Sequence, residues 1–321
     1  MEQEQLNAAQ RDHGGGLDSA IAKWGGTRAS WIDLSTGINP VPYSLPQVEK
    51  SDWTALPDRN AQNALLIAAR TFWNVPEQAD ILAAPGASSL IAALPTVIDG
   101  KSVHVPTPTY NEHAAAFEAR AWNLVDHQSD ADVQVLVHPN NPDGRLWDLS
   151  QPHANGLIID ESFGDTVPAT SHIARTRGPN TIVLKSFGKF WGLAGLRLGF
   201  AIGCPSLIAQ LCDAIGPWAV SGPALRIGAV ALNDADWAAQ TRSRLRLDSD
   251  LLDALMQRSG ATLCGGTTLF RLYEVADAQD VQNRLAKHHI WSRIFPYSSR
   301  WIRLGHPPSQ AWPRLEAAIQ A

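Results

Sequence analysis

Cysteine, long apolar runs and basic stretches are scarce in this sequence. Its 321 residues include three cysteines, Cys204, Cys212 and Cys264, an odd number without the C-x-x-C spacing of a zinc site. We therefore expect buried thiols in a reducing compartment, and no metal. No stretch is long and apolar enough to span a bilayer, and the polar start, Met1 to Gln10, is unlike a secretory leader. These absences favour a cytoplasmic protein without a membrane partner.

The charge is balanced and slightly acidic. Twenty-six basic and thirty-one acidic residues give a net charge of -5, without a basic run that could follow a phosphate backbone. We expect no nucleic-acid partner. Hydrophobic residues make up 45% of the chain, enough to bury the core of a large α/β domain with a smaller domain attached.

One turn carries the strongest chemical signal. Thr181–Leu184 and Leu198–Ile202 both have the pattern of buried strands, so the polar residues between them lie at a strand end, where functional side chains collect. Aromatic residues and glycines surround Lys189, a setting that disfavours the ammonium form and frees the amine as a nucleophile toward a carbonyl. Ser186 and Arg197 could together bind one phosphate. The alternative is a surface lysine beside an arginine in an ion pair.

A second turn has the pattern of an anion site. The strand Ile81–Pro85 leads into Gly86, Ala87 and Ser88, which precede the helix Leu90–Val97. Free backbone N–H groups and hydroxyls at a helix start favour a phosphate there. An ordinary serine cap is the alternative.

Two further strands lead into candidate site residues. Tyr110 follows the strand Lys101–Val105 and could stack on a flat ring, or simply be a core tyrosine. Asn141 follows Val133–Val137 in a proline-bracketed turn, where asparagine is also common for purely structural reasons.

Asp160 ends the buried strand Gly156–Ile159. A buried carboxylate needs a cationic partner, which makes this residue a candidate for a charged site; the alternative is a helix N-cap. Only nineteen positions separate Asn141 from Asp160, and Ser150–Asn155 has a loop-like composition. The connection between these two strands is therefore expected to be short and without its usual helix.

The start of the chain offers another possible anion site. In the run from His13 and Gly14 to Gly16, glycines allow close backbone approach and the histidine supplies donors, although a flexible linker has the same composition. The extended segment Trp31–Pro40 follows and contains Asn39.

The last third of the chain predicts long helices and then a small α+β domain. Helical spacing continues over Pro223–Ser259, with an interruption near Asn233. Arg293 and Arg303 are on strands of the small domain and could bind anions, or be solvated. The elements expected there are the strands Thr268–Tyr273, Ile290–Phe295 and Trp301–Leu304 and the helices Asp280–His288 and Trp312–Gln320.

Together these motifs resemble a known family. The lysine turn is similar to that of fold-type I pyridoxal-phosphate enzymes, the large aminotransferase class. The His-Gly-Gly run followed by Leu-Ser-Thr-Gly-Ile-Asn-Pro resembles the amino terminus of its L-threonine-O-3-phosphate decarboxylases. The resemblance implies a large, mostly parallel sheet with helices on both faces over residues 36–235. It also implies a small α+β domain over residues 236–321. An amino-terminal arm, residues 1–35, would join this small domain.

The resemblance also implies roles for individual residues. Lys189, Asp160 and Tyr110 would be catalytic, with Asp160 next to the cofactor's ring nitrogen. Cofactor binding would involve Gly86, Ala87, Ser88, Tyr110, Asn141, Asp160, Ser186, Lys189 and Arg197. Substrate binding would involve His13, Gly14, Asn39, Asn141, Arg293 and Arg303.

The implied reaction is pyridoxal-phosphate-dependent decarboxylation of L-threonine O-3-phosphate to aminopropanol phosphate in cobalamin biosynthesis, by a homodimer. Phe163 stands where aminotransferases commonly have tyrosine, which favours decarboxylation. Leu56 replaces a tyrosine that, in relatives, contacts the partner subunit's cofactor phosphate. The nearest alternative is an aminotransferase acting on a phosphorylated amine such as histidinol phosphate. A regulator of this fold is disfavoured, because about thirty residues before Asp33 are too few for a DNA-binding domain.

Overall fold

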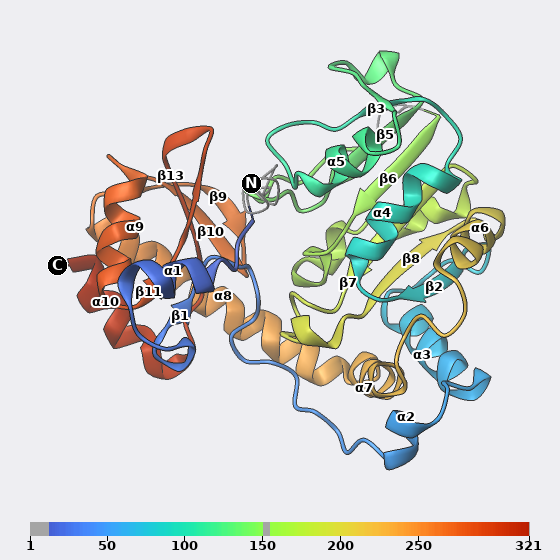
Figure 1. The fold of residues 1–321 in the computed structure, drawn as a ribbon, viewed down its shortest axis with the longest axis horizontal. Coiled ribbons are helices and arrows are strands. Elements are labelled where there is room, and N and C mark those ends of the chain that lie inside the picture. Colours follow the sequence, from blue (N-terminus) through green and yellow to red (C-terminus); the bar gives the residue numbers. More distant parts are fainter. Residues whose placement is uncertain (1–12, 150–154, 321) are drawn as a thin grey trace, which may run out of the picture. The chain divides into compact units, whose positions relative to one another are not determined.

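The computed structural model describes residues 13–149 and 155–320, which form two compact units (Figure 1). The large unit comprises Ile38–Ser249 and Gly265–Leu269, and the small unit comprises the residues up to Gly37, Asp250–Cys264 and Phe270 onward. The division runs within one long helix, α8 (Ala235–Arg258), whose continuous pattern gives no sequence signal of a boundary. The three-part domain organisation expected from the sequence stays a prediction.

A seven-stranded sheet forms the centre of the large unit (Figure 1). Strand β8 runs antiparallel to both of its neighbours, β2 and β7, and the remaining neighbours are parallel, which confirms the mostly parallel sheet. All residues of β5, β6 and β8 are buried, as expected for strands covered on both faces. In sheet order the strands are β2 (Asp80–Ala84), β8 (Gly199–Gly203), β7 (Thr181–Ser186), β6 (Gly156–Asp160), β5 (Val133–Val137), β3 (Ser102–His104) and β4 (Asn123–Leu124).

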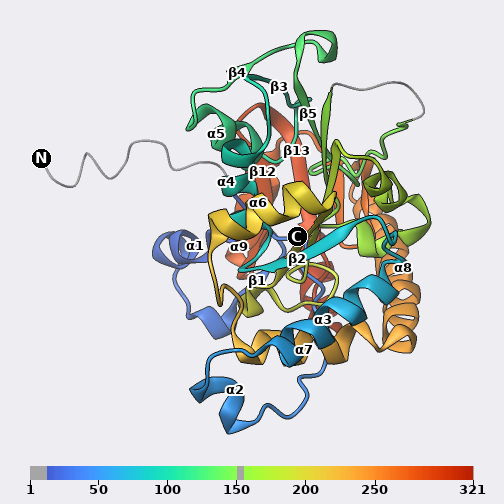
Figure 2. The same cartoon turned by 90° about the vertical axis from the view of Figure 1, so that its right-hand side faces the viewer.

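Helices α4 (Ala87–Val97), α5 (Glu112–Glu118) and α6 (Pro205–Ile215) pack on one face of this sheet and share its main apolar core. The opposite face buries a smaller apolar cluster with Leu136 and Ile159, next to the 3-10 segment Ile173–Arg177. Helix α3 (Arg59–Phe72) lies along α7 (Gly222–Leu232), as Figure 2 shows, with the short α2 (Lys50–Thr54) nearby.

The helix starts follow local sequence signals. The Asp58 carboxylate accepts a hydrogen bond from the N–H of Ala61 and caps α3. Ser221 accepts from the N–H of Ala224 at the start of α7, where Pro223 lies in the first turn. These caps satisfy backbone donors that have no partner within the helix.

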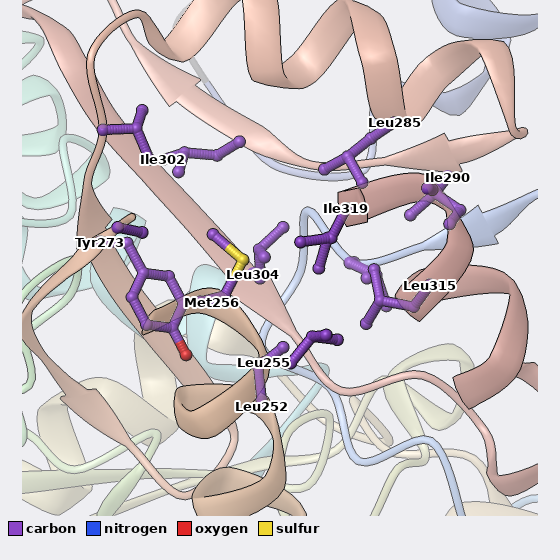
Figure 3. Close-up of a cluster of buried hydrophobic side chains, with 14 of the residues drawn as sticks. Leu252, Leu255, Met256, Tyr273, Leu285, Ile290, Ile302, Leu304, Leu315 and Ile319 are labelled. Atoms are coloured by element: carbon purple, nitrogen blue, oxygen red, sulfur yellow. The ribbon is translucent and has the colours of Figure 1, made fainter. Parts of the chain in front are cut away.

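The small unit has a four-stranded sheet in the order β12 (Arg293–Phe295), β13 (Ser298–Gly305), β10 (Phe270–Glu274) and β9 (Thr262–Thr267). Strand β13 is antiparallel to both neighbours. A parallel pair, β1 (Ile32–Asp33) and β11 (Ile290–Trp291), lies in the same unit. Figure 3 shows the apolar core, in which Leu304 and Tyr273 meet side chains from the helices. The helices are α1 (Leu17–Trp24), α9 (Ala278–Lys287), α10 (Trp312–Gln320) and the end of α8.

Two expectations need correction, and one alternative is excluded. The single strand predicted over Ile290–Phe295 is two strands, because Ile290 pairs with β1 whereas Arg293 pairs with β13. The cysteines are not buried: Cys212 and Cys264 are exposed and Cys204 is half-buried, since α6 turns one face outward and β9 is an edge strand. No α-helix begins at Asp160; the nearest helical element is a 3-10 turn at Gly164–Thr166.

The sequence signals missed helices α1, α2 and α5, which are short. The connection from β5 to β6 has no helix in its described parts, residues 138–149 and 155; most of the loop predicted over Ser150–Asn155 lies outside the described residues. Among the described helices, none is long and apolar enough to cross a membrane.

Candidate active site

The ends of β5, β6 and β7 and the start of α4 surround a pocket of about 150 Å³ in the large unit. Parallel strands end at the same edge of a sheet, so residues that follow them meet there. Eight of the predicted site residues line this pocket, together with Phe163 and Ser162. They are Ala87, Ser88, Tyr110, Asn141, Asp160, Ser186, Lys189 and Arg197.

One end of the pocket is suited to an anion. Gly86 has a φ of +84°, and a Cβ there would lie 2.5 Å from the guanidinium Nη2 of Arg197. A Cβ at Gly199 would lie 2.3 Å from the backbone nitrogen of Ala87. Only glycines allow this close packing of the α4 start against β8 and Arg197. The N–H of Ser89 donates to the Gly86 carbonyl, and the two N–H groups before it, which have no acceptor within the helix, thus lie beside a permanent cation.

Ser186 adds a hydroxyl to the same pocket. Its oxygen accepts a weak hydrogen bond from the N–H of Gly188, at 3.3 Å. The hydroxyl proton therefore stays available for donation to a bound oxygen atom.

Asp160 lies in the pocket as an ionised carboxylate. Its side chain is 2% exposed, and Oδ2 lies 2.9 Å from Nε2 of His113. Oδ1 accepts hydrogen bonds from the backbone N–H and the hydroxyl of Ser162. Burial raises the pKa of Asp160, but the contacts with His113 and Ser162 outweigh burial and leave this pKa below its ordinary value. The carboxylate is therefore ready to face a cationic group.

Aromatic side chains form the walls. The ammonium of Lys189 lies 5.5 Å from the ring centre of Phe163, within cation–π range. Tyr110 packs edge-on against His113 with 6.1 Å between ring centres. A flat ligand in this pocket would meet these rings.

Of the two adjacent asparagines, Asn140 has the structural role. Its side chain donates to the carbonyl of Pro108 and to Asp143, and accepts from the hydroxyl of Thr109. Asn141 lines the pocket. The turn thus holds the Asn140 side chain by hydrogen bonds and places Asn141 at the pocket.

Asn39 does not line this pocket; its side chain is buried and bonded to the protein. The amide nitrogen donates to the carbonyl of Phe190 at 2.9 Å, and the amide oxygen accepts from the N–H of Val41 and from Arg244. Its own backbone N–H donates to the carbonyl of Lys189 at 3.0 Å. Asn39 therefore holds the lysine turn.

The other predicted substrate-binding residues belong to the small unit. A Cβ at Gly14 would lie 2.3 Å from the carbonyl oxygen of Ser35, and Nη2 of Arg303 donates to that same oxygen at 2.6 Å. Arg293 pairs directly with Arg303 across the antiparallel strands β12 and β13. Gly14, Arg303 and Arg293 thus cluster around the Ser35 segment, and His13 precedes Gly14 in an exposed position.

Sequence reasoning missed His113. It follows Tyr110 by three positions, at the start of an unpredicted helix, and contacts an aspartate 47 positions later in the chain. A histidine one helical turn after a strand-end aromatic residue was the available signal.

Comparison with known proteins identifies the class. The family described as aminotransferase class I and II matches residues 122–312, and the chain belongs to this family. More particularly, it is 40% identical to a threonine-phosphate decarboxylase from a Sinorhizobium species, over 94% of this chain and 95% of that protein. It is 36% identical to the threonine-phosphate decarboxylase of Pseudomonas aeruginosa, over 96% and 97% of the two chains.

A solved structure confirms the fold. The histidinol-phosphate aminotransferase of Sinorhizobium meliloti, in complex with pyridoxal-5'-phosphate, superimposes with a TM-score of 0.81 and 18% identity, covering 98% of this chain and 99% of that one. The likeness confirms the predicted fold-type I architecture.

Proposed function

We propose that the protein is a pyridoxal-phosphate-dependent decarboxylase that converts L-threonine O-3-phosphate into (R)-1-aminopropan-2-ol O-phosphate and CO2, as a step of cobalamin biosynthesis. The observation that carries the proposal is the 36–40% identity, over nearly the whole chain, to two threonine-phosphate decarboxylases. The residues of the pocket support it independently.

The pocket residues fit the cofactor. The close packing of Gly86 against Arg197, beside the free N–H groups at the start of α4, suits the cofactor phosphate. Ser88 and Ser186 would add hydroxyl donors. The ionised, buried Asp160 suits the ring nitrogen, Asn141 the ring hydroxyl, and Tyr110 the ring face. Lys189 is the lysine that would bind the cofactor carbonyl.

When bound, pyridoxal phosphate supplies an electron sink for the electron pair that remains after CO2 leaves. Asp160 would keep the ring nitrogen protonated, because its low pKa makes it a carboxylate at neutral pH. The ammonium form of Lys189 would return a proton to the substrate's α carbon and become the neutral amine. Phe163 lines the pocket where aminotransferases commonly have tyrosine, a difference that favours decarboxylation over transamination.

The small unit would bind the charged groups of the substrate. Arg303 is proposed to bind the carboxylate, and Arg293 with the His13–Gly14 segment the phosphate. Arg293 and Arg303 are directly opposite each other on neighbouring strands, which places two guanidinium-bearing residues in one part of the small unit. A bidentate guanidinium also matches carboxylate geometry.

Mixing the enzyme with O-phosphothreonine in the absence of a keto acid tests the reaction. We expect continuous CO2 release, an unchanged cofactor spectrum, and poor turnover of free threonine. Stoichiometric conversion to the pyridoxamine form without CO2 would instead establish an aminotransferase of phosphorylated amines such as histidinol phosphate.

We further propose a homodimer. Large apolar side chains are exposed along residues 41–56, with Trp53 at 71%, Leu56 at 67% and Leu45 at 64%. Grouped exposed apolar residues are typical of an interface. Light scattering should give twice the chain mass; a monomer at micromolar concentration would contradict the proposal.

A further inference from the structure

Trp191 lies two residues after Lys189 and is completely buried. Its ring is sandwiched between Phe187, at 5.0 Å and an interplanar angle of 6°, and Trp237, at 5.1 Å and 12°. Tyr43, Phe72 and Phe190 also pack against the indole, with ring centres 5.8, 5.4 and 5.5 Å away. Aromatic packing thus confines the ring, and a hydrogen bond of its N–H adds a directional contact that sets its orientation.

Asp165 provides this contact. The indole N–H of Trp191 donates to Oδ2 of Asp165 at 3.1 Å, and the indole N–H of Trp73 donates to Oδ1 at 2.8 Å. The carboxylate is 4% exposed, and the ammonium of Lys185 lies 3.8 Å from Oδ1. Hydrogen bonds to a buried carboxylate are stronger and more directional than those between neutral groups.

The backbone of the same turn is held from the other side. The carbonyls of Lys189, Phe190 and Trp191 accept, in order, from the Asn39 N–H, the Asn39 side-chain amide and the Tyr43 N–H, at 3.0, 2.9 and 2.9 Å. Three consecutive carbonyls are thus fixed by one short segment. The Asp165–Trp191 bond is the side-chain contact that completes this support.

We propose that Asp165 and Trp191 are positioning residues that fix the turn presenting Lys189 to the cofactor. The inference rests on the proposed function, in which Lys189 binds the cofactor. A misplacement of a reacting group by about 1 Å can cost about a hundredfold in rate. The Asp165–Trp191 bond therefore bears on catalysis without touching substrate or cofactor.

Two matched substitutions test the proposal. Trp191→Phe keeps a stacked ring and removes one donor to Asp165; Trp73→Phe removes the other donor to the same carboxylate, outside the lysine turn. Both should lower the melting temperature. We expect Trp191→Phe alone to slow borohydride trapping of the cofactor on Lys189 and to lower kcat, each by about ten- to a hundredfold, with KM within about threefold.

Equal trapping rates and equal kcat in the two variants would overturn the inference, because the effect would then follow stability. If Trp191→Phe does not fold, Asp165→Asn replaces it: the neutral amide offers one acceptor for two indole donors, and wild-type trapping in that variant would refute the proposal. Trapping of the wild-type enzyme is measured first. If the cofactor is not trapped on Lys189 there, the proposed function fails together with the inference; if it is, only the inference is at stake.

Discussion

Replacing Gly86 with alanine would test the anion-binding end of the pocket by a steric effect. A Cβ would lie 2.5 Å from Nη2 and 3.1 Å from Cζ of Arg197, so the guanidinium must move. Losing a charge-assisted hydrogen bond to phosphate costs about 1.5 to 3 kcal/mol. This corresponds to about 10- to 150-fold weaker binding of pyridoxal phosphate. Since φ is +84°, backbone strain would also lower the unfolding free energy, by about 1 to 3 kcal/mol.

Gly195→Ala is the matched control. Gly195 lies in the turn that leads to Arg197, and its φ is not in the left-handed range. Apart from its two chain neighbours, no described residue has an atom within 4 Å of the position of its Cβ. We expect this variant to bind the cofactor like the wild type. The dissociation constants can be measured from cofactor quenching of tryptophan fluorescence, and the unfolding free energies by urea titration.

The two readouts separate strain from the loss of the anion contact. A Gly86→Ala protein that is less stable, yet binds pyridoxal phosphate within about threefold of the wild type, would refute the reasoning, because Arg197 would then contribute little to cofactor binding. Equal weakening in Gly195→Ala would show that the turn as a whole is sensitive and would contradict the steric argument.

Two further predictions follow from buried hydrogen bonds. Asp160→Asn should retain the cofactor but lower kcat by at least about a hundredfold, whereas a loss below tenfold, about 1.4 kcal/mol, would contradict the electron-sink role. Because the pKa of Asp160 is lower in the folded than in the unfolded protein, the ionised carboxylate stabilises the fold above its ordinary pKa near 4, and this stabilisation is lost as the pH falls further. The difference in melting temperature between the wild type and Asp160→Asn should therefore shrink below about pH 4. Asn39→Ala removes the hydrogen-bond partner of the Phe190 carbonyl and of the Val41 N–H. It should lower the unfolding free energy, measured by urea titration, by about 2 to 4 kcal/mol. A loss below about 1 kcal/mol would show that these two hydrogen bonds contribute little.

The pocket residues were predictable because each has a local signal. Tyr110 and Asn141 each come after a short apolar strand, and Asp160 ends one; the pattern gives the position of each strand to within a residue or two. Lys189 is in a turn that two such strands bound. Once the strands are parallel neighbours, their ends must meet at one edge of the sheet, so local signals suffice to assemble the site.

The supporting contacts have no such signal. His113 and Asp160 are 47 positions apart, and Trp73 and Asp165 are 92 apart. For Asn39 the resemblance implied a substrate-binding role. Its side-chain amide instead donates a hydrogen bond to the carbonyl of Phe190, 151 positions later in the chain. These partners depend on how the segments pack, which periodicity does not specify.

A buried ion pair lies on the face of the sheet opposite the pocket, because successive strand residues point to opposite faces. Asp160 and Ser186 line the pocket, so Glu161 and Lys185, the residues next to them, point to the opposite face. There the ammonium of Lys185 lies 2.6 Å from the carboxylate of Glu161, and both side chains are buried. Burial raises the pKa of Glu161, but the charge and hydrogen bond of Lys185, together with hydrogen bonds from Ser171 and the His172 N–H, leave this pKa below its ordinary value. Removing Lys185 would leave the buried Glu161 carboxylate without this ammonium partner, at a cost of about 3 to 5 kcal/mol, so positions beside the pocket residues are constrained as well.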